Sequence, residues 1–532
     1  MSESETFRLD TGVVVQPAYG PTDLEARGID VTDAAPGEFP YTRGISAEGY
    51  RSLPLLVKIY SGFGSPADSN GRFRKLAEWG ADIIHVAADL PTQTGYDPDH
   101  LMSSGEVGRA GVSIASLRDL EVMFDGVPLS SLSRVGMLGN SIGPIALAYF
   151  LALGERQGLG PGDYVVDLQN DPLKEYVARG TQFLPVEPAV RLALDVVEWT
   201  AEHAPHWYPL DVCVNHLNAA GAGSSKATAF AFANAQHYID TLIERGHDVD
   251  SFAPMLQLFV DERDDFFAAI ANARATRRIW ARMLRERYGA TRPESTALQL
   301  TAYGHGRESR VDPVTNVGRI MLGSLAYFFG GVQCLYAASY DEVLQLPSED
   351  SARFTVRTLQ ILRHELGLSL VADPLGGSWF VESLTAELER EILEALGEVE
   401  ELGGAVACIE NGHIRSAITD GAVRRQSRFE SGVRPLVGVS VHPTTDETGW
   451  QVRPSGIDAG CEEQRVRDVA ALRREREARR VAAALREVAA ACRTGDNLVP
   501  PVLEAVRAYT TLGEICDVFR EAFGEWQPDR TF

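Results

Sequence analysis

Polar side chains suited to anion binding and proton transfer follow an apolar run near the middle of the chain. In the segment 163–179 this run ends at Asp167 and Gln169, and Arg179 follows ten residues later. A guanidinium there suits a carboxylate ligand, because its fork of N–H donors matches two oxygen atoms. The same arginine could instead be tied to a helix end or to a neighbouring Asp. Pro172 predicts that a helix begins between the run and Arg179.

Further polar residues stand at the ends of other apolar runs: Tyr60, Asp89, Asn140, His216, Asp261, Tyr303 and His305. They do not have metal-ligand spacing, and neither a P-loop nor a nucleophile elbow is present. His216 is favoured as a ligand-facing histidine because small residues follow it, although a satisfied core histidine is the alternative. The cluster of Asp97, Asp99 and His100 is interpreted as capping its own loop.

Apolar runs and amphipathic patterns alternate along the chain from about residue 50 to residue 366. Eight short apolar runs predict strands, at residues 55–61, 83–89, 134–139, 164–168, 210–215, 255–260, 298–303 and 332–337. Amphipathic helical patterns follow them, at residues 71–79, 116–124, 145–157, 189–203, 226–245, 264–287, 316–329 and 351–366. This alternation predicts an α/β fold, a (β/α)8 TIM barrel whose functional residues lie after the strands. An open doubly wound sheet is the rival, and the absence of an early GxGxxG weakens its dinucleotide-binding form.

The sequence predicts three domains. Residues 1–50 are rich in Pro, Gly and Asp and predict an extended N-terminal arm. Residues 51–440 form the predicted substrate-binding barrel. Residues 441–532 form a predicted helical C-terminal extension, which contains one charged helix at about 462–494.

Composition limits the classes of partner. The net charge of −24 over 532 residues argues against nucleic acid or an anionic membrane as the main partner. The six cysteines are scattered without a CxxC pair, as is typical of reduced thiols in a cytoplasmic protein. The acidic N-terminus is unlike a signal peptide, and the apolar runs are too short for a membrane span.

Five motifs resemble the large, substrate-binding subunit of the methylmalonyl-CoA mutase family, and they lie at residues 60–64, 88–100, 105–112, 169–175 and 373–379. The resemblance implies a (β/α)8 barrel that works with adenosylcobalamin, whose radical removes and returns a substrate hydrogen while the carbon skeleton rearranges. In that family an Asp-x-His-x-x-Gly motif on a separate domain binds the cobalamin. This motif is not found in the sequence, so the resemblance implies a small cobalamin-binding subunit that contacts the C-terminal extension. It also implies a homodimer or an α2β2 assembly.

The resemblance assigns roles to individual residues. Tyr60 matches the tyrosine that assists Co–C homolysis and touches the substrate carboxylate, and Arg179 matches the arginine that pairs with this carboxylate. His216 matches the histidine that binds the thioester carbonyl, and Gln169 matches a neighbouring polar contact. Ala87 matches the small residue of enzymes acting on methylmalonyl groups.

The cofactor side is only partly retained. The resemblance directs Gly62, Gly139, Tyr303 and Glu342 toward the cofactor. The Asn that touches the adenosyl ribose in the family is Ala338 here.

Several positions depart from the family. Residues unlike the family's occupy its CoA channel, at Ser46, Glu48, Gly49, Leu53, Leu56 and Lys58. Among the predicted substrate-binding positions, His85, Asp167 and Asn215 replace a Ser, a Thr and a Tyr, whereas Arg274 is kept at a CoA-contacting position. Loss of phosphate-binding arginines should weaken CoA binding, since each charge-assisted hydrogen bond contributes about 1.5–3 kcal/mol.

Three functions therefore stay open. The first is a radical mutase acting on a carboxylated acyl thioester of the methylmalonyl-CoA/succinyl-CoA or ethylmalonyl-CoA type. The second is the same mechanism on a free carboxylic acid, a carrier-protein-bound acyl group, or an amino acid with Asp167 or Glu48 as its ammonium partner. The third is a non-catalytic binding or assembly subunit, which the loss at Ala338 favours and which the retained Tyr60 and Arg179 oppose.

Overall fold

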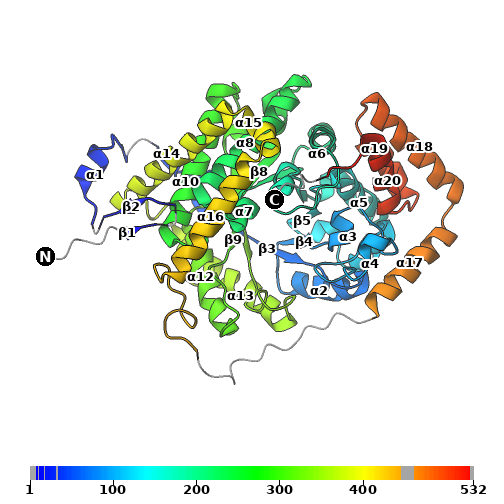
Figure 1. Cartoon of the computed structure of the whole chain (residues 1–532), viewed down its shortest axis with the longest axis horizontal. Helices are drawn as coiled ribbons and strands as arrows, with labels where there is room; N and C mark the ends of the chain where they lie inside the picture. The colour runs from blue at the N-terminus through cyan, green and yellow to red at the C-terminus, as the bar shows by residue number, and fades with distance from the viewer. Residues whose placement is uncertain (1–6, 10, 17, 32–33, 445–459, 528–532) are drawn as a thin grey trace. The chain divides into compact units, whose positions relative to one another are not determined.

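Eight strands form one sheet in a computed structural model that describes residues 7–9, 11–16, 18–31, 34–444 and 460–527 (Figure 1). They are β3 (Leu56–Ser61), β4 (Ile83–Val86), β5 (Arg134–Leu138), β6 (Val166–Gln169), β7 (Leu210–Cys213), β8 (Leu256–Val260), β9 (Gln299–Gly304) and β10 (Cys334–Ala337). Their order in the sheet is β6-β5-β4-β3-β10-β9-β8-β7. The (β/α)8 barrel predicted from the alternating pattern is confirmed, and each predicted strand has its counterpart.

A short bridge closes the sheet between its two end strands. Tyr208, just before β7, pairs in parallel with Asp167 of β6, and the Leu168 backbone N–H donates to the Tyr208 carbonyl at 2.8 Å. The registers elsewhere are also parallel, with Tyr60 opposite His85. Parallel strands bring their carboxyl ends to one edge, which is where barrel enzymes carry their functional residues.

Helices lie between the strands, as the amphipathic patterns predict. They are α2 (Pro66–Glu78), α4 (Leu117–Met123), α5 (Gly143–Arg156), α6 (Val186–His203), α8 (Ser224–Glu244), α10 (Phe266–Arg282), α12 (Asn316–Phe329) and α13 (Glu349–His364). Local chemistry sets several of their starts. Ser65, for example, caps α2: its hydroxyl accepts from the Asp68 backbone N–H, and the Asp68 carboxylate accepts from the Ser65 backbone N–H.

The chain divides into two compact units. Unit 1 comprises Met1–Val57 and Val212–Pro454, and unit 2 comprises Lys58–Asp211 and Ser455–Phe532. Unit 1 contains β8 to β10, whereas unit 2 contains β4 to β6 and most of β3. The predicted domain boundaries near residues 50 and 440 stay a prediction.

The N-terminal arm belongs to unit 1 and packs on its helices. It forms the antiparallel pair β1 (Phe7–Arg8) and β2 (Val14–Val15) and the short helix α1 (Pro21–Glu25). The side chains of Leu9 and Val13 are buried against α10 and α14 (Trp379–Glu401), which lie beside the arm in Figure 1. Burial of these apolar side chains holds the arm against the helices.

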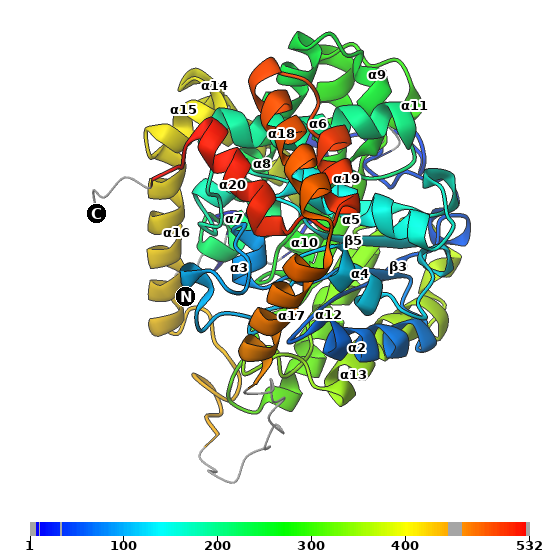
Figure 2. The ribbon, with the colours of Figure 1, turned by 90° about the vertical axis from the view of Figure 1, so that its right-hand side faces the viewer.

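The C-terminal segment belongs to unit 2, where it adds four helices: α17 (Cys461–Glu475), α18 (Ala478–Thr494), α19 (Val499–Arg507) and α20 (Leu512–Phe523). Figure 2 shows α17 running beside α4, to which Arg465 is tied by an ion pair with Asp119 at 2.7 Å. The prediction of one helix at about 462–494 is wrong. The backbone is extended at Arg476, and this separates α17 from α18. The Arg476 guanidinium binds the Glu514 carboxylate at 2.5 Å.

A second prediction needs correction. The helix expected to begin near Pro172 is only a four-residue 3-10 turn, Leu173–Tyr176. Its polar side chains turn inward instead of lining an exposed helix face. Lys174 and Glu175 are fully buried and form an ion pair at 2.6 Å, and the Thr181 hydroxyl also binds the Glu175 carboxylate. This buried ion pair fixes the conformation of the turn, and the helix ends at Tyr176.

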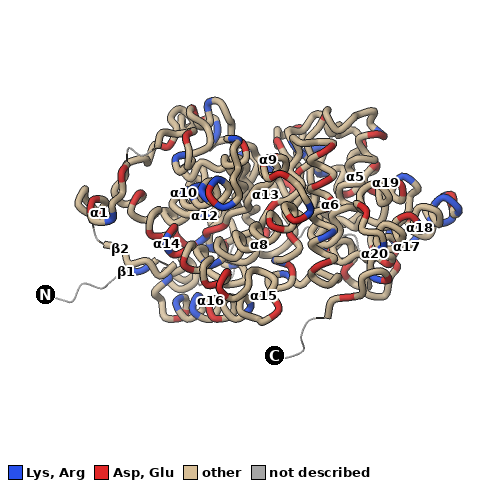
Figure 3. Tube along the Cα trace, turned by 90° about the horizontal axis from the view of Figure 1, so that it is seen from above, with Lys and Arg blue, Asp and Glu red and all other residues tan. Residues whose placement is uncertain are grey.

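Acidic and basic residues alternate along much of the surface trace (Figure 3). On α14, for example, Arg390 lies 2.6 Å from both Glu387 and Glu394. Within the described residues, no helix is long and apolar enough to cross a membrane.

A buried ion pair lies on the inward face of the strands of unit 2. The Lys58 ammonium donates to the Asp167 carboxylate at 2.9 Å, and both side chains have zero exposure. The Arg134 guanidinium lies 3.6 Å from the same carboxylate and stacks over the Tyr208 ring. Burial works against ionisation of Asp167, but Lys58 and Arg134 together hold its pKa below the ordinary value.

Removal of one partner of this pair tests its place in the fold. Lys58→Met leaves a buried carboxylate with only the more distant Arg134, so the free energy of unfolding should fall by about 3–5 kcal/mol in urea denaturation. Arg74→Met is the control, because it breaks the exposed 2.5 Å pair with Asp125 and should cost under about 1 kcal/mol. A loss of under about 1 kcal/mol for Lys58→Met as well would contradict a structural role for the buried pair.

Candidate functional site

Tyr60, at the end of β3, is the most accessible of the predicted site residues on the strands of unit 2. Its side chain is 38% exposed, although Ile59 and Ser61 beside it are buried. The ring centroid of Tyr60 lies 6.1 Å from that of His85 on the adjacent strand β4. The phenol is therefore open to a ligand that approaches from the carboxyl ends of these strands.

Asp167 and His85 belong to the closed interior beside Tyr60. Asp167 is held by Lys58 and Arg134, so its carboxylate is not available as the ammonium partner considered for an amino acid substrate. Burial, and secondarily the positive charge of Lys58, lower the pKa of His85 to about 3. His85 is therefore a neutral imidazole at pH 7. Burial also raises the pKa of Asp211 well above its ordinary range.

Gln169, at the end of β6, is oriented by two donors. Its Oε1 accepts from the Lys174 ammonium at 3.1 Å and from the Asn140 side-chain amide at 3.3 Å. The Asn140 carbonyl oxygen in turn accepts from the Asp171 backbone N–H at 3.0 Å. With both donors on Oε1, the amide nitrogen of Gln169 is the group directed to a ligand, where it can donate to a substrate oxygen.

Arg179 is half-buried and is positioned by an amide. It donates to the Gln93 side-chain oxygen at 3.1 Å, and the Gln93 nitrogen donates to the Ala88 carbonyl at 2.7 Å. The positive charge of Arg179 also acts on a neighbouring carboxylate: against burial, Lys174 and then Arg179 lower the pKa of Glu175. Five N–H donors fixed by one neutral acceptor leave capacity for a carboxylate ligand. The hydrogen bond to Gln93 involves a neutral amide, and the binding of a substrate carboxylate by Arg179 stays a prediction.

In unit 1, the strand that precedes His216 ends two residues earlier than predicted. The strand β7 ends at Cys213, and Asn215 and His216 occupy the first turn of α7 (Val214–Ala220), where they are half-buried. The sequence pattern extended the strand because Val212 and Val214 are β-branched. Gly221, with φ of 132°, ends this helix.

Two of the predicted cofactor-side residues of unit 1 bind each other. The Tyr303 phenol donates to the Glu342 carboxylate at 2.8 Å, and the Ser339 backbone N–H donates to its second oxygen at 3.0 Å. Burial, opposed by these hydrogen bonds, raises the pKa of Glu342. Ala338 is buried and supplies no polar side chain. Glu342 is thus a preorganised acceptor for a hydroxyl, which fits one of the two ribose contacts that the resemblance implies.

The glycines predicted to face the cofactor lie in unit 2 and permit close backbone approach. A Cβ at Gly62 would lie 2.3 Å from the Ala87 carbonyl oxygen, so only glycine fits there. The Gly139 backbone N–H donates to the Gln169 carbonyl at 2.7 Å. Ala87 itself is buried after β4. Gly62 thus allows two segments of the chain to pack closely, and the approach of a cofactor to these glycines stays a prediction.

Arg274 is held inside unit 1 by two acids. Its guanidinium lies 2.5 Å from the Asp373 carboxylate and 2.8 Å from the Glu382 carboxylate, and it is 1% exposed. These contacts tie α10 to the start of α14. The role of Arg274 in substrate binding stays a prediction, with its charge already matched in this structure.

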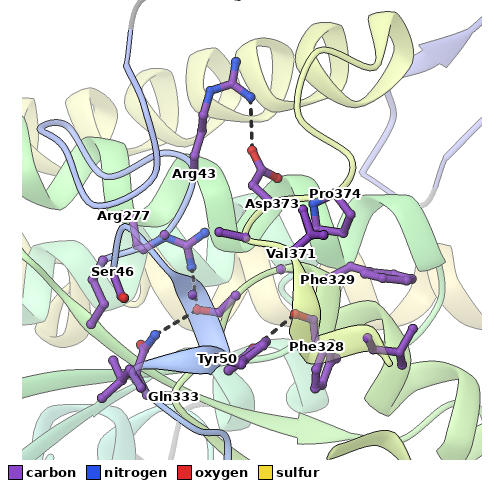
Figure 4. Close-up of a pocket in the computed structure, with 18 residues that line it drawn as sticks. Arg43, Ser46, Tyr50, Arg277, Phe328, Phe329, Gln333, Val371, Asp373 and Pro374 are labelled. Carbon is purple, nitrogen blue, oxygen red and sulfur yellow. Dashed lines mark hydrogen bonds and ion pairs between the residues drawn. The ribbon is translucent and has the colours of Figure 1, made fainter. Parts of the chain in front are cut away.

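Three positions that the resemblance assigns to a CoA channel line a pocket of unit 1 (Figure 4). They are Ser46, Gly49 and Leu53, and the pocket volume is about 40 Å³. Arg277 on its wall is buried and donates to the backbone carbonyls of residues 41, 42 and 331. Tyr50 donates to the Phe328 and Val332 carbonyls at 3.1 and 2.8 Å.

The loop cluster of Asp97, Asp99 and His100 makes capping contacts, as interpreted from the sequence, and it also binds the C-terminal helices. The Asp97 carboxylate accepts from the Gly513 backbone N–H at 2.9 Å and pairs with Arg473 at 2.7 Å, and Asp99 also binds Arg473. His100 accepts from the backbone N–H of residue 102. Within the described residues, no cluster of three acidic, His or Cys side chains could hold a metal ion.

Sequence reasoning missed the residues that orient the site. Lys174 and Gln93 hold Gln169 and Arg179, and Arg134 and Asp211 surround Asp167. A signal existed only for some of them. A charged residue inside an apolar run, as Asp211 is in β7, predicts a buried titratable group, whereas nothing in the spacing joins Gln93 to Arg179.

Comparisons with known proteins agree over nearly the whole chain. The family model described as methylmalonyl-CoA mutase matches residues 8–525. The 2-hydroxyisobutanoyl-CoA mutase large subunit of Aquincola tertiaricarbonis is 35% identical over 531 residues, which cover 99% of this chain and 94% of that protein. The methylmalonyl-CoA mutase of Rhizobium meliloti is also 35% identical, over 98% of this chain and 73% of that enzyme. The mitochondrial methylmalonyl-CoA mutase of Homo sapiens is 33% identical, over 97% and 68% respectively.

The neutral state of His85 predicts an acid-sensitive fold. Its pKa is about 3 in the folded protein, whereas an unfolded histidine titrates near 6.5, so protons bind preferentially to the unfolded chain between these values. The free energy of unfolding should therefore fall as the pH drops from about 6.5 to about 3, by up to about 1.4 kcal/mol per pH unit from this group. Urea denaturation across this range measures the slope. His85→Gln should flatten it, and His203→Gln at an exposed position should not; an unchanged slope in His85→Gln contradicts the assignment.

Proposed function

The chain belongs to the methylmalonyl-CoA mutase family, and on that premise we propose that it is the large subunit of an adenosylcobalamin-dependent radical mutase acting on a carboxylate-bearing substrate. The rearrangement is of the methylmalonyl/succinyl or ethylmalonyl type. The observation that carries the proposal is Arg179. This half-buried guanidinium is held in place by the Gln93 amide, and its further N–H donors can bind a substrate carboxylate.

Each oriented side chain has a part in this proposal. Arg179 binds the substrate carboxylate through two parallel N–H donors. The Gln169 side chain is oriented by Lys174 and Asn140, and its amide N–H donates to a second substrate oxygen. His216, from unit 1, is assigned the substrate carbonyl on the strength of the family resemblance. Fixed donors of this kind hold the reactant in one orientation without reorganisation during the reaction.

Adenosylcobalamin, when bound, would supply the radical that removes and returns a substrate hydrogen. Glu342 would accept from the adenosyl ribose, and Gly62 and Gly139 would allow close approach of the cofactor to the backbone. Tyr60 would stand between cofactor and substrate carboxylate, because its phenol is exposed at the end of β3. Its hydroxyl can donate to that carboxylate and exclude water from it.

A small cobalamin-binding subunit is part of the proposal. The relative that this chain covers to 94% is named a large subunit. We assign the surface formed by α17 to α20 as the contact with the partner, in an α2β2 or homodimer-based assembly. A cytoplasmic location goes with it, since the six cysteines are free thiols.

Isotope transfer tests the mechanism. With a cobalamin-binding partner and adenosylcobalamin deuterated at C5′, deuterium should enter at least one acid or thioester of the methylmalonate, ethylmalonate and succinate series. Arg179→Gln should lower kcat/KM by roughly 10²–10⁴-fold, since loss of one partner of a desolvated charge pair costs about 3–5 kcal/mol. Tyr60→Phe should lower kcat more than it raises KM. Arg74→Gln, on the exposed face of α2, is the control and should change neither constant.

The outcome that rejects the proposal is specific. If the assembled complex binds its cofactor and yet no deuterium reaches any compound of the series, the chain is a binding or assembly subunit. The loss of a polar side chain at Ala338 favours that second candidate.

A further inference from the structure

On the inward face of β3, a solvent-exposed side chain and a fully buried side chain lie two residues apart. Side chains alternate along a strand, so Lys58 and Tyr60 share one face. Tyr60 is 38% exposed, whereas Lys58 has no exposure at all. Solvent therefore reaches the phenol from the carboxyl end of the strand and stops before the ammonium.

The adjacent strands of unit 2 continue this closed surface. Asp167 on β6 has zero exposure and His85 on β4 has 1%. Lys58 and Asp167 are joined at 2.9 Å, and Arg134 approaches the same carboxylate at 3.6 Å. A flexible chain passing along the inside of these strands would have to separate two ions from which water is excluded, which is strongly unfavourable.

The amino ends of the strands give a second, independent observation, in unit 1. The Leu56 backbone N–H at the start of β3 donates to the Gln333 carbonyl just before β10. The pocket beside these two starts, lined by Tyr50, Leu53 and Gln333, has a volume of about 40 Å³. Sites that enclose drug-sized ligands measure roughly 300–1,000 Å³. The Arg43–Asp373 pair and the buried Arg277 hold its walls together (Figure 4).

We infer that the substrate is a compact free carboxylic acid, and not the CoA or carrier-protein thioester of that acid. It enters from the carboxyl ends of the strands, places its carboxylate on Arg179, and rests above the Lys58–Asp167 pair. Because no carrier arm passes between the strands, the substrate is recognised by its acyl portion alone. The inference rests on the proposed function, and it names the substrate class of the same site.

Binding to the intact chain tests this without turnover. Isothermal titration calorimetry would compare methylmalonate, ethylmalonate and succinate with their CoA thioesters, with free CoA as competitor. At least one acid should bind at least 10-fold more tightly than its own CoA thioester. Arg179→Gln should weaken the binding of that acid by at least 10-fold. A smaller preference, a preference for any thioester over its acid, or no binding of the three acids would overturn the inference.

A variant addresses the buried pair directly. Lys58→Ser combined with Asp167→Ser removes both ions of the pair together, while Arg134 keeps its stacking contact with the Tyr208 ring. In the folded double variant, methylmalonyl-CoA should gain at least 10-fold in affinity, while free methylmalonate should change less than threefold. If the folded variant gains nothing for the thioester, the assignment of exclusion to this pair is wrong. The wild-type titration decides the substrate class even if the variant does not fold.

The two proposals fail in different ways. Deuterium transfer to a thioester, with thioester binding preferred, would support the radical mutase and overturn the free-acid inference. Selective binding of a free acid without any deuterium transfer would leave the inference standing as a ligand preference and reject the mutase.

Discussion

The ion pair between Lys58 and Asp167 is the constraint on which the strands of unit 2 depend. Two opposite charges without any exposure cannot be separated cheaply, so the strands that carry them are fixed in relative register. Because side chains alternate, fixing Lys58 and Asp167 also fixes Tyr60 and Gln169, each two residues further along. The exposed chemistry at the strand ends is thus positioned by charges that never meet solvent.

A division between groups that bind a ligand and groups that orient them follows from this arrangement. Arg179 and Gln169 each have one side committed to a neighbour, Gln93 in one case and Lys174 in the other. These hydrogen bonds fix the direction of each side chain, and its remaining N–H donors can bind a ligand. Such preorganisation lowers the entropy lost when a substrate binds.

The barrel was predictable from the sequence because its signal is periodic and repeated. Each strand candidate, such as 256–260, is an apolar run followed by an amphipathic helix, and this alternation is hard to produce otherwise. Local breaks were not predictable. The helical pattern runs through Arg476, and only the distant Glu514 explains why the chain turns there. The turn after Pro172 was misjudged for the same reason, since inward pairing of Lys174 overrides the local helix signal.

The sequence predicted which residues form the site better than it predicted the surroundings of each residue. Tyr60, Arg179 and Gln169 could be named from motifs, yet whether Asp167 faces a ligand depends on a lysine 109 positions away. The buried loop acid Asp97 of unit 2 is a related case. Its carboxylate binds Thr511, 414 residues later in the chain. During synthesis, the first strands leave the ribosome long before the segment that supplies the hydrogen bond to Asp97. Until then, this part of the barrel is incompletely packed, and chaperones can bind it.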